Sequence, residues 1–398
     1  MRKIAGVSFV CCVGILSLAF PMKCHAQKEN DQFDSFVRGQ DSLFTQFADS
    51  ITNQYGAFVK QQLADFQKFK EEIDRYWDDA VYPSNKDYVE YSDSFQSRLH
   101  IDFEKGDVRA SVLIDDPGAP GSFEAAKAKL TGELQRAITS PGRDKPYELA
   151  DGAGEIGGRA LLAGQVVDSR GRVVNAGQAV QYARDVIASA GITADTIISK
   201  DNRRRIKLTG DFKLVPDHLK KRAREHLPYA SQFAKQYNLD LRLVLAIMHT
   251  ESYFNPRATS RIPAFGLMQV VPGTAGRDAY KKVYGVDKLL GPDYLYDPRN
   301  NVELGCAYLN ILRFAYLKDI AGDQEAYPCV IASYNGGIGT VCKALTGTKS
   351  LSNIAGSTKG ASSDELVQQL NRKLPYQETR DYLNKVLERM ALYNEWAR

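Results

Sequence analysis

A single carboxylate, Glu251, stands in an otherwise apolar run from Leu243 to Ser252. If this run is helical, Val244, Ile247 and Met248 share the face of Glu251, since they precede it by seven, four and three positions. Apolar surroundings disfavour the ionised form, so we expect the pKa of Glu251 to be raised. An acid that keeps its proton near neutral pH suits general acid catalysis. Many helices end in an exposed glutamate, however, and this residue alone does not establish an active site.

Three neighbouring motifs give Glu251 a context. Ser252-Tyr-Phe-Asn-Pro256 ends the helix directly after the acid, which places it beside a loop that a substrate can reach. Gly266-Leu-Met-Gln269 combines a permissive backbone with an amide that can bind acetamido or hydroxyl groups. Tyr334 and Asn335 precede two glycines, which predicts a loop whose backbone can approach a ligand closely.

Other chemistries find no support in the sequence. The five histidines, at positions 25, 100, 218, 226 and 249, are scattered and form no metal-binding spacing. There is no phosphate-binding glycine loop followed by lysine, and no Gly-x-Ser-x-Gly motif. We therefore expect no metal and no cofactor, and acid–base work by a carboxylate remains.

The elements that must position these residues fall into two regions. Before Pro216 the pattern predicts mixed elements: a helix from Gln32 to about Trp77, a hairpin from His100 to Ile114, a helix from Phe123 to Ile138, a second hairpin from Ala163 to Val174, a helix from Gln178 to Ala190 and a strand from Ile206 to Val215. After Pro216-Asp217 the pattern is almost wholly helical, with helices expected at 217–237, 240–251, 273–284, 300–316, 323–334, 362–372 and 376–395. We predict an α+β N-terminal module, with its helical lead, over 27–215 and an all-α catalytic domain over 216–398.

Residues 1–26 are typical of a secretory signal peptide. Arg2 and Lys3 precede an apolar run from Ile4 to Phe20, and Cys24-His-Ala26 offers small residues before a cleavage point. An uncleaved membrane anchor is the alternative, although the run is short for a membrane span. We expect an exported, periplasmic protein.

The charge balance bears on the class of binding partner, and the cysteine content bears on possible disulfides. Cleavage would leave 49 basic and 48 acidic residues, a balance that gives no support to nucleic-acid binding. Three cysteines would survive: Cys306, Cys329 and Cys342. An oxidising compartment permits a bridge, for example between the two that flank Tyr334, but three buried thiols are an equally good interpretation.

Four ordered motifs resemble those of the lysozyme-like lytic transglycosylases of glycoside hydrolase family 23. They are Glu251-Ser252, Gly266-Leu-Met-Gln269, Ser333-Tyr-Asn-Gly-Gly337 and Glu378-Thr-Arg-Asp-Tyr382. Upstream, Lys86-Asp-Tyr-Val-Glu-Tyr91, Gly164-Gln-Val-Val-Asp168 and Val215-Pro-Asp-His-Leu219 resemble the N-terminal module and junction of a membrane-bound branch of that family. The resemblance covers most of residues 70–398.

The resemblance implies a lysozyme-like catalytic domain that acts on peptidoglycan glycan strands. It implies cleavage of the β-1,4 bond between N-acetylmuramic acid and N-acetylglucosamine, with formation of a 1,6-anhydromuramic end. Most glycosidases need two carboxylates, whereas this family uses one, here Glu251, first as acid and then as base. The cleft-lining residues that it implies are Ser260, Met268, Gln269, Tyr334, Asn335 and Tyr382. Met268 is by default a core residue, and Glu378 fits a helix N-terminal role better than catalysis.

Two alternatives and one departure accompany this interpretation. A goose-type lysozyme-like hydrolase would deliver water in place of the sugar's own hydroxyl, and a non-catalytic wall-binding module would keep only the fold. The membrane-bound branch carries a lipid anchor, whereas Cys24 follows Lys23, where lipoprotein signals require a small residue. Association with the outer membrane or a cell-wall complex is therefore an open expectation.

Overall fold

The computed structural model describes residues 53–142, 159–189, 191–260 and 263–397. The strands and helices described below, from Tyr55 onward, belong to one compact unit, Tyr55–Arg398. The signal predicted at 1–26 and the start of the helical lead lie outside the described residues. Within the described ranges, no helix is both long enough and apolar enough to cross a membrane.

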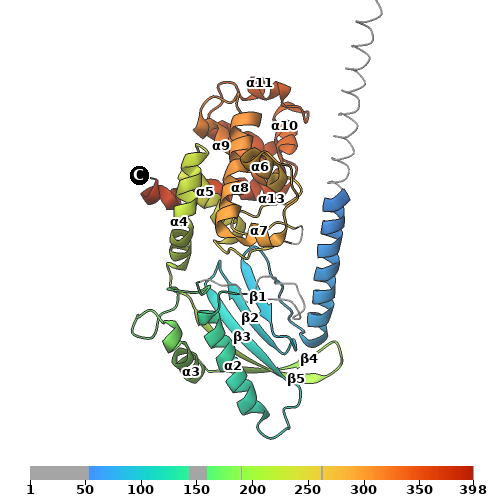
Figure 1. The fold of residues 1–398 in the computed structure, drawn as a ribbon, viewed down its shortest axis with the longest axis vertical. Helices are drawn as coiled ribbons and strands as arrows, with labels where there is room; N and C mark the ends of the chain where they lie inside the picture. Colours follow the sequence, from blue (N-terminus) through green and yellow to red (C-terminus); the bar gives the residue numbers. More distant parts are fainter. Residues whose placement is uncertain (1–52, 143–158, 190, 261–262, 398) are drawn as a thin grey trace, which may run out of the picture. The chain divides into compact units, whose positions relative to one another are not determined.

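A five-stranded antiparallel sheet forms the N-terminal module (Figure 1). Its strands lie in the order β1-β2-β3-β5-β4. The bounds are β1 (Asp87–Tyr91), β2 (Ser97–Asp102), β3 (Asp107–Ile114), β4 (Thr193–Ile198) and β5 (Arg204–Lys213). The hairpin predicted from His100 to Ile114 is confirmed as β2 and β3, which pair Asp102 with Asp107 beside the turn.

Helices cover both faces of this sheet, and alternate side chains along its strands pack into two separate cores. On β3, Val112 packs with α2 (Ser122–Thr139) and α3 (Ala179–Ser189), whereas its neighbour Leu113 packs with helix 53–76. Successive strand residues point to opposite faces, so one strand serves both cores. Trp77 closes the second core, where Arg98 lies 4.5 Å from its ring centroid.

The second predicted hairpin, Ala163–Val174, is present only in a minimal form, without regular strands. The structure has one isolated bridge there, between Val167 and Val173. The turn itself is present, because the Asp168 carboxylate accepts hydrogen bonds from the backbone N–H groups of Arg170 and Arg172. Strand β4 escaped prediction because only one of its six residues is buried, which leaves no clear alternation.

The C-terminal half is all-helical, as predicted. Its elements are α4 (His218–Gln236), α5 (Leu241–Ser252), α6 (Ala275–Tyr284), α7 (Pro292–Tyr296), α8 (Pro298–Ile311), η3 (Leu312–Tyr316), α9 (Asp323–Gly336), α10 (Ile338–Thr346), η4 (Leu351–Asn353), α11 (Ile354–Thr358), α12 (Ser363–Lys373), α13 (Gln377–Met390) and η5 (Ala391–Trp396). The short helices α7, α10 and α11 were not predicted, since few turns carry too little periodicity to detect.

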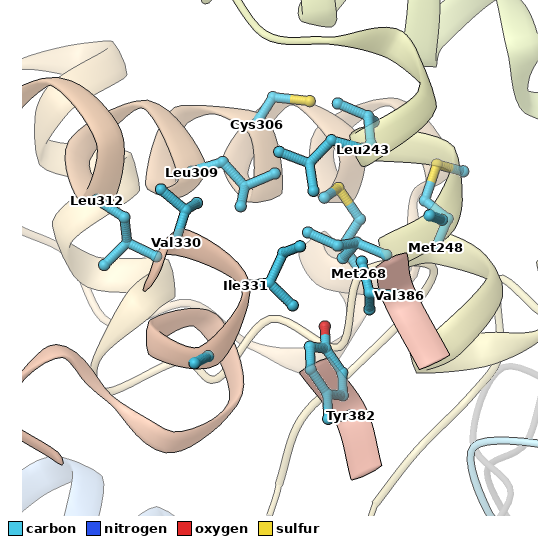
Figure 2. Close-up of a cluster of buried hydrophobic side chains, with 14 of the residues drawn as sticks. Leu243, Met248, Met268, Cys306, Leu309, Leu312, Val330, Ile331, Tyr382 and Val386 are labelled. Carbon is cyan, nitrogen blue, oxygen red and sulfur yellow. The ribbon is translucent and has the colours of Figure 1, made fainter. Parts of the chain in front are cut away.

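Helix α5 passes through the core of this helical domain. Its residues from Leu243 to Thr250 are buried on every side, and not on one face only as the spacing predicted. Figure 2 shows Leu243 and Met248 among side chains from other elements, including Met268 and Val386. A helix enclosed in this way holds its C-terminal turn at a defined place, and Glu251 lies on that turn.

Candidate active site

The end of α5 sets the position of Glu251. Asp240 caps the start of the helix by accepting a hydrogen bond from the Arg242 backbone N–H. At the other end, Tyr253 and Phe254 adopt left-handed backbone conformations, with φ of 50° and 58°. Pro256 follows shortly and cannot continue a helix. Glu251 therefore projects from the last turn, directly before a sharp change in chain direction.

The Glu251 side chain is half-buried, and its carboxyl group is hydrogen-bonded. Tyr382 on α13 donates its hydroxyl to Glu251 Oε1 at 2.6 Å. Burial raises the pKa of Glu251 to about 7, the Tyr382 hydrogen bond opposes this, and the negative charge of Glu378 adds to it. With a pKa near neutrality the same group can donate a proton and later accept one.

A cavity of about 570 Å³ opens beside this carboxyl group. Part of its wall comes from the helical domain and part from the N-terminal module; the lining residues are Phe66, Tyr82, Pro83, Ser84, Asn85, Glu251, Thr259, Ser260, Ala264, Gln269, Val271, Tyr334, Asn335 and Glu378. A larger hollow of about 850 Å³ lies at the opposite end of α5, around Asp240 and Arg242. Asp240 is paired with Arg242, and Asp323, the other carboxylate in the lining of this hollow, is paired with Arg313.

The structure brings five of the seven predicted site residues to the cavity wall: Glu251, Ser260, Gln269, Tyr334 and Asn335. Tyr382 is buried and reaches the site through its hydrogen bond to Glu251. The side chain of Met268 is fully buried and packs against Gly305, where an added Cβ would lie 2.3 Å from its sulfur. Met268 therefore belongs to the core and not to the cavity wall, contrary to the implied cleft position (Figure 2).

Gln269 has one polar atom to offer a ligand. Its Nε2 donates to the backbone carbonyls of Ala258 and Gly266, at 2.9 and 3.0 Å. Its Oε1 is buried and has no hydrogen-bond partner within the structure. A buried acceptor without a partner costs free energy, so a substrate N–H or O–H group would be favoured at this place.

Tyr334 and Asn335 lie on the last turn of α9 and not on a loop, which corrects the prediction. The Tyr334 hydroxyl donates to the Met268 carbonyl at 2.8 Å, which ties α9 to the Gly266–Gln269 turn. The glycine that follows serves helix packing: a Cβ at Gly336 would lie 2.8 Å from Thr379 on α13. Burial raises the pKa of Tyr334 well above its ordinary value, so its hydroxyl keeps its proton and remains a donor.

The Tyr82–Asn85 turn and Glu378 are among the cavity residues that were not predicted as part of the site. Tyr82-Pro-Ser-Asn85 is a turn in the sequence, and nothing local indicates that it reaches a cavity 170 positions or so further along the chain. Glu378 lies in the first turn of α13, as predicted, but it also faces the cavity.

The three cysteines, Cys306, Cys329 and Cys342, are buried free thiols, so no bridge stiffens the Tyr334 region.

Comparison with known proteins agrees with this arrangement. Residues 228–355 match the Transglycosylase SLT domain, and residues 57–225 match the family described as Membrane-bound lytic murein transglycosylase C, N-terminal domain. Membrane-bound lytic murein transglycosylase C of Pectobacterium atrosepticum is 32% identical over 373 residues, covering 92% of this chain and 94% of that protein. The protein of the same name from Photorhabdus laumondii is 32% identical over 369 residues, with coverage of 92% and 94%.

Among solved structures, an inactive mutant of lytic transglycosylase Slt from Pseudomonas aeruginosa is 27% identical, with a TM-score of 0.33. That alignment covers 42% of this chain and 24% of the other. The two domain matches, in the same order as the sheet module and the lysozyme-like helical domain, span most of the chain. The protein is a peptidoglycan lytic transglycosylase, and the chain belongs to the membrane-bound lytic murein transglycosylase C family.

Proposed function

We propose that this lytic transglycosylase cleaves the β-1,4 bond between N-acetylmuramic acid and N-acetylglucosamine without water and leaves a 1,6-anhydromuramic end. One observation carries the proposal: Glu251 lines the cavity with a pKa of about 7 and accepts a hydrogen bond from Tyr382. A group with that pKa is matched to acid work followed by base work at neutral pH.

The proposed reaction has two proton transfers through the same carboxyl group. Protonated Glu251 gives its proton to the glycosidic oxygen as the bond from that oxygen to the anomeric carbon breaks. The muramic 6-hydroxyl then attacks the anomeric carbon and returns its proton to the Glu251 carboxylate. The acid is regenerated, one C–O bond is exchanged for another, and no water is consumed. Attack within the same sugar gains from proximity.

Other cavity residues support this sequence of steps. Gln269 Oε1 is a buried acceptor suited to an acetamido N–H or a hydroxyl group. Asn335 and Ser260 present polar side chains at the cavity wall. Tyr382 orients the carboxyl group, and its hydroxyl stays protonated because burial raises the pKa of Tyr382 well above its ordinary value. We propose substrate-binding or orienting roles for these four residues and for Tyr334.

Glu378 gives the competing hydrolase a specific basis. It is a second carboxylate on the wall of the same cavity, and most glycosidases use two. A carboxylate that activates water would produce ordinary reducing ends in place of anhydro ends. The feature that weighs against the hydrolase is electrostatic: the charge of Glu378 acts to keep Glu251 protonated, which supports the acid without requiring a second catalytic group.

Mass spectrometry of products from purified sacculi tests the proposal. Digestion in water enriched in heavy oxygen should give anhydro products, lighter than reducing ends by one water and free of the heavy isotope. Reducing ends that carry heavy oxygen as the main product would establish the hydrolase instead.

Two variants make the test specific. Glu251→Gln should lose about 10²- to 10⁴-fold in rate, the usual contribution of a general acid–base group. Glu378→Gln should keep anhydro products, because the proposal gives Glu378 no proton to transfer. If Glu378→Gln abolished turnover as completely as Glu251→Gln, the single-carboxylate mechanism would be wrong.

We also propose that the protein is exported and acts in the cell envelope on peptidoglycan strands. The names of the two relatives describe membrane-bound enzymes, and residues 1–26 have the pattern of a signal peptide. In this proposal 1–26 is removed, 27–215 forms the N-terminal module and 216–398 the catalytic domain. The intact mass of protein purified from the envelope should correspond to a chain that begins at Gln27. A mass that includes residues 1–26 would indicate retention as an anchor.

A further inference from the structure

Arg222 on α4 is a buried cation whose hydrogen bonds converge on the turn after Glu251. Its Nε donates to the Tyr253 carbonyl at 3.1 Å, and its Nη2 donates to the Phe254 carbonyl at 2.9 Å. The side chain is 3% exposed. A planar guanidinium with several fixed donors can hold two adjacent carbonyls at once, which the single point charge of a lysine cannot do.

The turn that Arg222 holds is conformationally unfavourable. Tyr253 and Phe254 both have positive φ, a region that residues with a Cβ rarely occupy and almost never in succession. Such a conformation persists only where the surroundings over-determine it. His226, one helical turn beyond Arg222, also hydrogen-bonds to the Phe254 backbone. The buried face of α4 therefore stabilises a turn that begins two residues after Glu251.

The other side of the Arg222 guanidinium contacts the N-terminal module. It lies 3.6 Å from the ring centroid of Phe103, at the end of the β2–β3 hairpin. Its Nη1 donates to the Leu161 carbonyl and to Gln165 Oε1, both at 3.4 Å. A second contact with the hairpin is a hydrogen bond: the Tyr253 hydroxyl donates to Glu104 Oε1 at 2.7 Å. The hairpin tip and the active-site turn are thus joined through one cation and one tyrosine.

We propose that Arg222 is a positioning residue for Glu251, which locks the Tyr253–Phe254 turn and makes the N-terminal module part of the catalytic alignment. The inference rests on the proposed role of Glu251 as the acid and base. Arg222 itself touches no substrate in this assignment. It acts through the backbone, because loss of the two carbonyl contacts releases the C-terminal turn of α5. Misplacement of a catalytic group by about 1 Å can cost about 10²-fold in rate.

The test compares Arg222→Met with Arg222→Lys in the full-length protein. Arg222→Met should lower kcat about 10- to 100-fold while KM changes by less than about twofold, since the substrate contacts are kept. The high-pH midpoint of the kcat profile should move to lower pH, because water that enters the loosened turn favours the ionised carboxylate. Arg222→Lys keeps the positive charge but loses the planar guanidinium with its several donors. Its kcat and its pH midpoint should lie between those of Arg222→Met and wild type.

Arg98→Met is the matched control. Arg98 is also 3% exposed and also stacks on an aromatic ring, that of Trp77, but its contacts stay within the N-terminal module. Both variants should lose thermal stability, and only Arg222→Met should change kcat and the pH midpoint. Equal kcat and equal midpoints for the two variants at a similar loss of Tm would overturn the positioning role.

Two further measurements keep the outcome decisive. A carbon-13 NMR titration of the Glu251 carboxyl, assigned by its absence in Glu251→Gln, reports its environment independently of turnover. An unchanged titration in Arg222→Met would sink the proposal even if Glu251 proved not to be the catalytic acid. Should Arg222→Met fail to fold, Tyr253→Phe removes only the hydroxyl that donates to Glu104 and accepts from Arg389, and we expect a smaller shift of the titration in the same direction. No shift in that variant would count equally against the proposal.

Discussion

The hydroxyl of Tyr382 donates a 2.6 Å hydrogen bond to Glu251 Oε1 across 131 residues of sequence. This contact joins the last turn of α5 to α13. The hydrogen bond favours the ionised carboxylate, whereas burial and the charge of Glu378 favour the protonated acid. The balance leaves the pKa of Glu251 at about 7, which suits both proton transfers of the proposed reaction.

The pH profile should show this balance. Because the first step needs protonated Glu251, kcat should fall as pH rises through about 7. Glu378→Gln removes a negative charge, so it should lower the pKa of Glu251 and move this midpoint to lower pH. Initial rates on soluble glycan strands, measured across the pH range for both proteins, check the direction. A midpoint that moved upward would contradict the electrostatic role of Glu378.

Tyr382→Phe should move the midpoint the other way. Without the donated hydrogen bond the carboxylate loses stabilisation, so the pKa of Glu251 should rise and the fall in kcat should begin at higher pH. The carboxyl group also loses its fixed orientation, and we expect kcat about 10- to 100-fold lower, in line with a hydrogen bond to a charged group. The same rate assay serves, and a full-rate Tyr382→Phe enzyme would exclude an orienting role.

Glu251→Gln should make the protein more stable at neutral and alkaline pH. The folded pKa of about 7 lies above the ordinary value of 4.5, so the contribution of Glu251 to stability is fully present below pH 4.5 and is lost as pH rises through 7. The glutamine variant has no such loss. Its advantage should grow between pH 4.5 and 7 and then level off at about 3 kcal/mol. Denaturant unfolding at several pH values measures it; an advantage independent of pH would argue against a raised pKa.

Met268 should behave as a core residue. Met268→Ala should cost about 2–5 kcal/mol of unfolding free energy, because it leaves a cavity between α8 and the Gly266–Gln269 turn. Met268→Leu should cost less than about 1.5 kcal/mol and leave KM unchanged, because it keeps the volume. Thermal unfolding and substrate titration of the two variants separate packing from binding. A raised KM in a fully stable Met268→Leu enzyme would return Met268 to the substrate site.

Gly266 is a position where both backbone and space require glycine. Its φ is 75°, and an added Cβ would lie 2.4 Å from the Asn301 amide and 2.5 Å from the Leu295 carbonyl. Asn301 is itself buried and accepts a hydrogen bond from the Met268 N–H, so its side chain cannot move away from the added Cβ without losing that bond. Gly266→Ala should therefore cost about 3 kcal/mol or more in unfolding free energy.

Gly285 supplies the comparison for Gly266. Its φ is 72°, but nothing lies within 4 Å of an added Cβ. Gly285→Ala should cost only the left-handed conformation, about 1 kcal/mol. Denaturant unfolding of the two variants, measured side by side, separates backbone strain from steric overlap. Equal losses would mean that the overlap at Gly266 is relieved without cost.

Much of the architecture was predictable from local pattern. The β2–β3 hairpin has a clear turn at Glu104-Lys-Gly-Asp107, and the long helices after Pro216 have strong periodicity. Predictions failed where that local pattern was weak or misleading. The exposed strand β4 shows no alternation, and the two glycines after Asn335 suggested a loop where α9 continues to Gly336. The first of them, Gly336, packs closely against Thr379, a contact that depends on a helix further along the chain.

The amino-acid sequence by itself determined the type and order of the chemical groups: one acid in an apolar helix, an amide after a glycine turn and two later tyrosines. The tertiary structure decided which of them meet. It placed Tyr382 on Glu251, Glu378 within electrostatic reach and the Tyr82–Asn85 turn on the same cavity, and it buried Met268 in the core. Burial, charge and hydrogen bonding act through space, so the pKa that the proposed acid and base role of Glu251 requires exists only in the folded chain.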